Sequence, residues 1–141
     1  MSQVGALLLG FFLSFPSSFT ADIERAFLQN DARWLLVRLP ADRPVSIALP
    51  EPISFSDQIS REQAYFLFRN IFRSYATFEF FPEPNVYASP RGDRGIFKAR
   101  WSFLDASEKQ FVFEAYFHVQ SRPDGRGGVV WEITEIKADR L

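Results

Sequence analysis

The sequence contains no cysteine and a single histidine, His118, and these absences remove several classes of chemistry. Without cysteine there can be no disulfide, no thiolate metal site and no thiol nucleophile. One histidine is too few for a multi-histidine metal site. An excess of basic residues is also lacking, because 16 Lys and Arg stand against 17 Asp and Glu, whereas duplex binding needs a basic patch. We therefore expect no metal, no cofactor and no nucleic-acid partner.

Hydrophobic and aromatic residues are abundant instead. Hydrophobic residues make up 47% of the 141 residues, and aromatic residues make up 17%. This content is too high for a disordered chain, which needs low hydrophobicity and a high net charge. The length is that of one domain, since a domain takes about 100–200 residues. The composition therefore predicts one globular domain with a large aromatic core.

An uncharged apolar run, VGALLLGFFLSF, covers Val4–Phe15. It is shorter than the roughly 20 residues of a membrane span, and its length is typical of the apolar region of a secretory signal. No basic residue precedes it, and a cut after Ala21 would leave the bulky Phe19 close to the bond, so a buried helix or a membrane tether is the alternative. We interpret residues 1–20 as a signal-like segment of an exported protein, periplasmic or extracellular, and residues 21–141 as one domain.

Helical patterns precede residue 77. Thr20 can cap a first helix, and ARWLLVRL predicts a short second helix that ends before Pro40. Ser60–Gln63 is a capping-box pattern and predicts the start of a third helix. Between the second and third helices, Val45–Leu49 alternates as a strand does.

From Thr77 onward the pattern has a period of two, which is typical of strands. Glycine-rich or proline-rich turns divide it into four predicted strands: Thr77–Tyr87, Gly95–Leu104, Gln110–Gln120 and Val129–Lys137. Long strands joined by hairpins form antiparallel sheets. The predicted fold class is α+β, with three N-terminal helices packed on a curved, mainly antiparallel four-stranded sheet.

The alternation also predicts which side chains form the core. If the two hairpins centre near Ser107 and Gly125, Trp101 lies opposite Phe113 and Phe117 lies opposite Ile133. The residues on this face are almost all aromatic or aliphatic, so the face is a core rather than a cofactor site. Each large side chain buried there contributes roughly 1.5–3 kcal/mol to stability.

The opposite sheet face is mixed in character. The same register places Arg100 opposite Glu114 and His118 opposite Glu132, and cross-strand charge pairs of this kind stabilise a sheet modestly. His118 is thus interpreted as a surface partner of Glu132 rather than a catalytic group. Apolar residues lie among these charges and would suit either a homodimer surface or an ordinary solvated face; they are Val112, Tyr116, Val130 and Ile136.

Arg91-Gly92-Asp93 spells the integrin-binding tripeptide. It stands between two predicted strands, where a tight turn favours glycine and aspartate. We interpret it as a turn.

The order of these elements resembles that of the nuclear transport factor 2-like superfamily, the cystatin-like cone. Within it, the chain resembles the exported bacterial domain of unknown function 4783 family. The segments that carry the resemblance are DIERAFLQNDARWLLVRL, VSIAL, SREQAYFLFRNIFRSY and VVWEITEIKADR, and it covers about Ala21–Leu141. It implies a sheet wrapped into a cone, a pocket between the concave face and the helices, and frequent dimers through the sheet. Some members are isomerases or dehydratases, and others only bind.

We expect a non-catalytic domain that binds a small apolar ligand or a protein partner through the cone pocket or the sheet face. The predicted ligand-binding residues are Tyr65, Phe68, Trp101, Phe113 and Trp131. The alternative is a small isomerase-like or dehydratase-like enzyme, which needs a base and a hydrogen-bond donor in the pocket. Asp57, Glu79 or Tyr65 at the rim could supply the base, and Tyr75 the donor.

Overall fold

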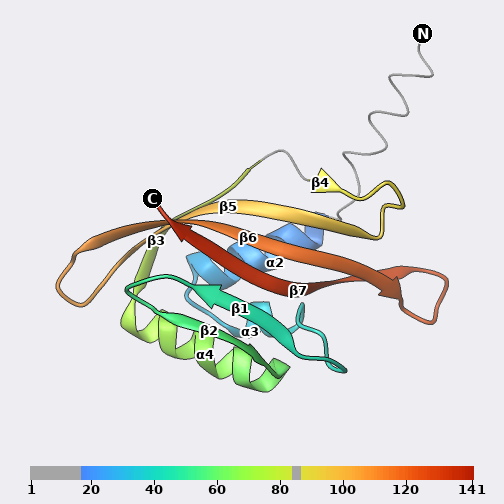
Figure 1. The fold of residues 1–141 in the computed structure, drawn as a ribbon, viewed down its shortest axis with the longest axis horizontal. Helices are drawn as coiled ribbons and strands as arrows, with labels where there is room; N and C mark the ends of the chain where they lie inside the picture. Colours follow the sequence, from blue (N-terminus) through green and yellow to red (C-terminus); the bar gives the residue numbers. More distant parts are fainter. Residues whose placement is uncertain (1–16, 84–86) are drawn as a thin grey trace, which may run out of the picture.

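The computed structural model describes residues 17–83 and 87–141, so the apolar run Val4–Phe15 lies outside the described residues. The described helices are α2 (Ser17–Leu28), α3 (Arg33–Leu36) and α4 (Arg61–Ser74). The strands are β1 (Val45–Leu49), β2 (Phe55–Ile59), β3 (Ala76–Pro82), β4 (Tyr87–Ala88), β5 (Arg94–Leu104), β6 (Gln110–Pro123) and β7 (Val129–Arg140). None of the described helices is long and apolar enough to cross a membrane. The long strands β5, β6 and β7 lie side by side across the molecule (Figure 1).

Within the described residues the sheet has seven strands rather than the four predicted, in the order β2-β1-β7-β6-β5-β3, with β4 paired to β5. The β1–β2 hairpin extends it because β1 runs parallel to β7. Pairing is therefore mixed. Strand β2, with the sequence FSDQI, lacks the apolar alternation that would predict a strand, because only its Ile59 is buried. The α+β class itself is confirmed.

Helix α4 begins as predicted. Ser60 Oγ accepts a hydrogen bond from the Gln63 backbone N–H at 3.1 Å, and the Ser60 N–H donates to Gln63 Oε1 at 2.9 Å. The capping box is thus confirmed, and it satisfies two backbone donors that a helix N-terminus leaves free.

Helix α2 begins earlier than predicted. Thr20 lies inside the helix and is not its cap, because its hydroxyl donates to the Ser17 carbonyl at 3.1 Å. Phe19 has no exposed surface and belongs to the core, and Arg38 lies over its ring at 5.4 Å. Burial of this aromatic ring explains why the helix includes Ser17–Thr20.

The buried residues on the core face of β5, β6 and β7 are all apolar. They are Phe97, Ala99, Trp101, Phe103, Phe111, Phe113, Ala115, Phe117, Val119, Trp131, Ile133 and Ile136, and each is at most 6% exposed. Trp101 lies opposite Phe113 as predicted, with the ring centroids 5.6 Å apart and the rings perpendicular. Phe27 of α2 packs against five rings, from α4, β3, β5 and β6. Helix and sheet therefore meet in one aromatic layer.

The predicted register between β6 and β7 is wrong. Phe117 lies opposite Ile136 instead of Ile133, and His118 lies opposite Glu135 instead of Glu132. The register shifts at His118/Val119, where Thr134 is the extra residue of a β-bulge. The bulge also reverses the predicted orientation of Ile136, which is 1% exposed in the core and so does not belong to the outer face.

The β5–β6 turn depends on one carboxylate. Asp105 Oδ1 accepts hydrogen bonds from the Ser107 N–H, the Ser107 hydroxyl and the Lys109 N–H, at 2.9, 2.7 and 2.9 Å. The Ser107 hydroxyl, followed by the Lys109 N–H, lowers the pKa of Asp105 below its ordinary value of 3.8.

A carboxyl whose pKa is lowered by folding stabilises the fold when it is ionised. We therefore expect Asp105→Asn, which keeps the acceptor oxygen but not the charge, to lower the free energy of unfolding at pH 7. The difference should shrink as the pH falls below 3.8, because the carboxyl is then protonated first in the unfolded chain and, at lower pH, in the folded protein as well. Urea denaturation at several pH values measures it. A difference that does not change with pH would contradict this role of the charge.

Candidate functional site

Three of the five predicted ligand-binding residues lie together in the aromatic core. Phe68 and Trp101 pack against Phe27 with ring centroids 6.0 and 5.0 Å away, and Trp101 packs against Phe113. These three residues are at most 1% exposed. Their rings are covered by protein, so a ligand could reach them only after the core had rearranged.

The other two predicted residues lie elsewhere. Tyr65 is half-buried on α4, beside Phe66. Trp131 is 4% exposed and lies opposite Ser121, at the far end of the β6–β7 ladder from Phe113. That the five residues form one ligand site stays a prediction.

The candidate bases of the enzyme hypothesis are not brought together. Asp57 is exposed on β2, whereas Glu79 lies on β3 at the opposite edge of the sheet. Glu79 accepts a hydrogen bond from the Ser102 hydroxyl at 3.2 Å, and Arg100 lies 3.8 Å from it. The Tyr75 hydroxyl, the candidate donor, donates instead to the Pro52 carbonyl at 3.4 Å. The side chains of Asp57, Glu79 and Tyr75 therefore do not form one catalytic group.

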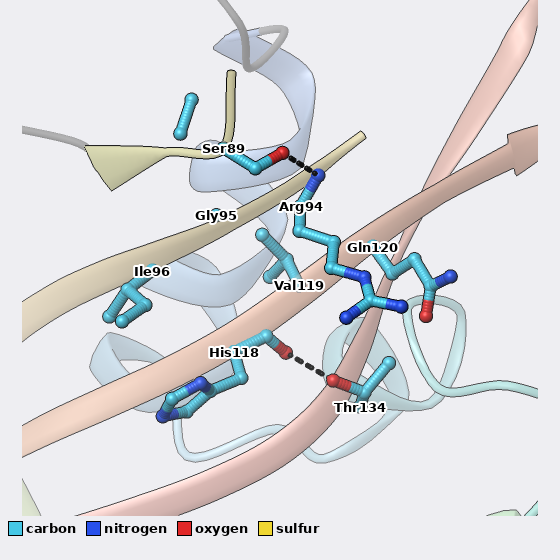
Figure 2. A pocket seen from close by; sticks show the side chains of 9 residues that line it. Ser89, Arg94, Gly95, Ile96, His118, Val119, Gln120 and Thr134 are labelled. Carbon is cyan, nitrogen blue, oxygen red and sulfur yellow. Dashed lines mark hydrogen bonds between the residues drawn. The ribbon is translucent and has the colours of Figure 1, made fainter. Parts of the chain in front are cut away.

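A hollow of about 530 Å³ lies on the outer face of the sheet, where β4 and the starting end of β5 meet β6 and β7. Its lining residues are Ala88, Ser89, Arg94, Gly95, Ile96, His118, Val119, Gln120 and Thr134. Figure 2 shows the Arg94 side chain extending toward Gln120, with Ile96 and His118 on the other side of the hollow. Small-molecule sites have volumes of about 300–1,000 Å³. The hollow is therefore large enough for a small ligand.

The β-bulge shapes one wall of this hollow. The Thr134 hydroxyl donates to the His118 carbonyl at 3.2 Å, which holds the extra residue against β6 (Figure 2). His118 Nε2 lies 3.4 Å from Glu135 Oε1, and Lys137 Nζ lies 3.6 Å from the same oxygen. The histidine thus has an acidic neighbour as predicted, but it is Glu135 and not Glu132. Sequence reasoning missed the hollow because a bulge has no clear pattern in a single sequence.

The Arg91-Gly92-Asp93 segment borders the hollow and forms a turn, as predicted. Gly92 has a φ of +70°, which favours glycine. The Asp93 carboxylate accepts a hydrogen bond from the Ser89 hydroxyl at 2.9 Å. Ser89 Oγ in turn accepts one from the Arg94 N–H at 3.3 Å (Figure 2). The positive φ of Gly92 and the hydrogen bonds of Asp93 explain why these residues occur here, as parts of a turn.

The rest of the outer face carries ion pairs. Arg100 lies opposite Glu114 as predicted, yet Glu114 pairs with Lys98 at 2.9 Å. This hydrogen bond lowers the pKa of the Glu114 carboxyl and raises that of Lys98. Within residues 17–83 and 87–141, no three His, Asp or Glu side chains gather as a metal ion would need.

One carboxylate on this face is buried, which sequence reasoning missed. Glu132 is 4% exposed and lies opposite Gln120. Its Oε1 accepts a hydrogen bond from Arg122 Nε at 2.9 Å. Since a buried charge needs a partner, Arg122 accounts for its presence.

No protein-family profile and no curated protein matches the sequence. Solved structures do resemble it. An NTF2-like protein of unknown function in nutrient uptake from Rhodospirillum rubrum has a TM-score of 0.61 at 10% identity, over 87% of this chain and 95% of that one. A candidate dehydratase of the NTF2-like family from Streptomyces avermitilis has 0.61 at 18%, over 87% and 91%. A candidate isomerase from Bacillus subtilis has 0.61 at 12%, over 88% and 86%. The chain therefore has the nuclear transport factor 2-like fold.

Proposed function

We propose that this protein is a non-catalytic binding module that takes a small molecule in the outer-face hollow. One observation carries the proposal: the buried residues on the core face of β5, β6 and β7 are all apolar and at most 6% exposed. Acid–base catalysis needs a titratable group within hydrogen-bond reach of the reacting atom. The buried residues on the described core face of these strands supply none. At the hollow, His118 is already engaged, because its Nε2 lies 3.4 Å from Glu135 Oε1.

The outer-face hollow suits binding better than the core does. It is open to solvent, and its wall combines the apolar Ala88 and Ile96 with the polar Gln120 and Thr134. Small-molecule sites typically combine apolar walls with a few polar groups that fix orientation. A ligand can enter without displacing any aromatic ring of the core.

The enzyme hypothesis remains the alternative. Among the similar structures are the candidate dehydratase and the candidate isomerase, which share the fold at 18% and 12% identity. In this chain Asp57 and Glu79 lie on the two edge strands of the sheet, β2 and β3, so the strand order does not pair them. A cone-pocket site for an apolar ligand at Phe68, Trp101 and Phe113 is the other alternative.

Native mass spectrometry of protein purified from its own host tests the proposal. We expect the wild-type protein to carry a small molecule. Ala88→Trp should lose it, because an indole at this position fills the hollow. The matched variant Ala106→Trp, in the exposed β5–β6 turn, should keep it. A wild-type protein without added mass would overturn the proposal, and so would an Ala88→Trp variant that keeps the ligand, because the ligand would then bind elsewhere.

We also propose the homodimer through the outer sheet face. Phe81 is 60% exposed and lies opposite Arg100, and the half-buried Val112 and Tyr116 lie on the same face. If this face is the interface, Tyr116→Glu should halve the mass measured in solution, since it would place a second carboxylate beside Glu114. Val37→Glu, an exposed position on the helical side, should leave the mass unchanged. A wild-type protein that is already monomeric would remove this proposal.

We propose from the sequence that the protein is exported and that it resembles the domain of unknown function 4783 family. The run Val4–Phe15 has the length and the uncharged apolar character of a secretory signal. This supports a periplasmic or extracellular location. The likeness to the domain of unknown function 4783 family is proposed on the quoted segments.

A further inference from the structure

Arg94 differs from the other cations of the outer sheet face. Lys98, Arg100, Arg122 and Lys137 each lie within 3.8 Å of a carboxylate oxygen. Arg94, at the start of β5, forms no ion pair with any acid of the described residues. The ranges outside the description, 1–16 and 84–86, contain no Asp or Glu. Its guanidinium is therefore the one on this face that no carboxylate of the chain neutralises.

The local register explains why Arg94 lacks an acid. Arg94 lies opposite Gln120, and Gln120 lies opposite Glu132. The Glu132 carboxylate is held by Arg122 at 2.9 Å. The residue that could have neutralised Arg94 across the sheet is thus already paired, and the neutral amide of Gln120 stands between them.

Donors and apolar surface meet at this point. Figure 2 shows the Arg94 guanidinium reaching toward the Gln120 side chain at one side of the hollow, while Ile96 lies at the other side. A guanidinium presents its N–H groups as a planar fork that matches a carboxylate. The Gln120 amide can add a neutral donor. Ala88 and Ile96 supply apolar contact for a short hydrocarbon.

We propose that the hollow binds a small organic carboxylate, with Arg94 as its charge partner, Gln120 as a second donor, and Ile96 and Ala88 against its apolar body. This rests on the proposed function and narrows the ligand class. Because Arg94 has no partner in the chain, a carboxylate meets it without breaking an ion pair. A cation would meet the unpaired guanidinium and be repelled.

Titrations followed by backbone amide NMR test the ligand class. The probes are hexanoate, hexan-1-ol and hexylamine, which share a six-carbon chain and differ in the head group. Hexanoate should shift the amide signals of Gln120 and Thr134 to saturation, and the alcohol and the amine should bind at least about tenfold more weakly. The expected tenfold difference corresponds to about 1.4 kcal/mol, and it reflects the loss of charge-assisted hydrogen bonds to Arg94.

Two variants test whether Arg94 causes the preference for hexanoate. Arg94→Gln should weaken hexanoate about tenfold or more and bring it level with the alcohol. Arg126→Gln, in the exposed β6–β7 turn, is the matched control and should change nothing. Arg94 is exposed, so the melting temperature of its variant should equal that of the wild type.

The outcomes separate this inference from the proposed function. If hexan-1-ol binds as tightly as hexanoate, or if Arg94→Gln binds hexanoate like the wild type, the carboxylate inference is wrong, while a ligand lost on Ala88→Trp would still support the binding module. If no probe gives a saturable shift at the hollow, the inference is also wrong, and native mass spectrometry decides the proposed function independently.

Discussion

Replacing Phe27 with alanine is expected to lower the free energy of unfolding by about 3–5 kcal/mol, the range for removing a buried aromatic side chain. Phe27 is 1% exposed, and its ring packs against Phe68, Phe72, Phe80, Trp101 and Phe117 at centroid distances of 4.5–6.0 Å. These partners come from α4 and three strands, so the ring joins the helices to the sheet. Because single domains have a total stability of about 5–15 kcal/mol, the loss is a large share of it. Urea denaturation measures it.

Phe66→Ala is the matched control. Phe66 is also a helical phenylalanine, but it is 54% exposed. Its removal should change stability by about 0.5 kcal/mol or less, as for most surface positions. Equal losses for Phe27→Ala and Phe66→Ala would mean that the aromatic layer does not join helix and sheet as described.

A chain that begins at Asp22 is expected to be less stable than one that begins at Ser17, by about 3–5 kcal/mol for the lost aromatic ring. The shorter chain lacks Phe19, which has no exposed surface, and with it the contact between that ring and Arg38. A cut after Ala21 would therefore remove part of the core. The melting temperatures and urea midpoints of the two chains measure the difference.

A point substitution separates the ring from the helical turn. Phe19→Ala in the chain that begins at Ser17 should reproduce most of the loss. If this substitution costs less than about 1 kcal/mol, well below the range for a buried phenylalanine, Phe19 does not contribute to the core and a cut after Ala21 would be compatible with the fold.

Much of the fold could be predicted because alternation is a strong local signal. Strict alternation along β5 and β6 placed Trp101 opposite Phe113, and the capping box placed the start of α4. The polar strand β2 was not predicted, since its pairing with β1 depends on contacts that are distant from its own sequence. The parallel pairing of β1 with β7 is equally non-local.

The site was harder to predict than the fold. The β6–β7 hairpin centres on Arg126 rather than Gly125, which moves the partners on β7 by two residues, and the extra residue Thr134 moves them by a third, so His118 meets Glu135. The bulge alone turns Ile136 into the core. A period-two pattern does not reveal such a shift, because the residues on both sides of the bulge still alternate between the two faces. Arg94 was not singled out either, since its lack of an acidic partner appears only when the pairs of its neighbours are known.

Two side-chain N–H signals give the most direct test that ligands bind on the outer face and not inside the cone. The Trp101 indole N–H donates to Thr77 Oγ1 at 2.8 Å within the core and reports on the interior. The Gln120 amide reports on the hollow. When hexanoate is added, we expect the Gln120 amide signals to move to saturation while the Trp101 indole signal stays in place. Movement of the indole signal with an unchanged Gln120 amide would place the ligand in the core and contradict the central claim.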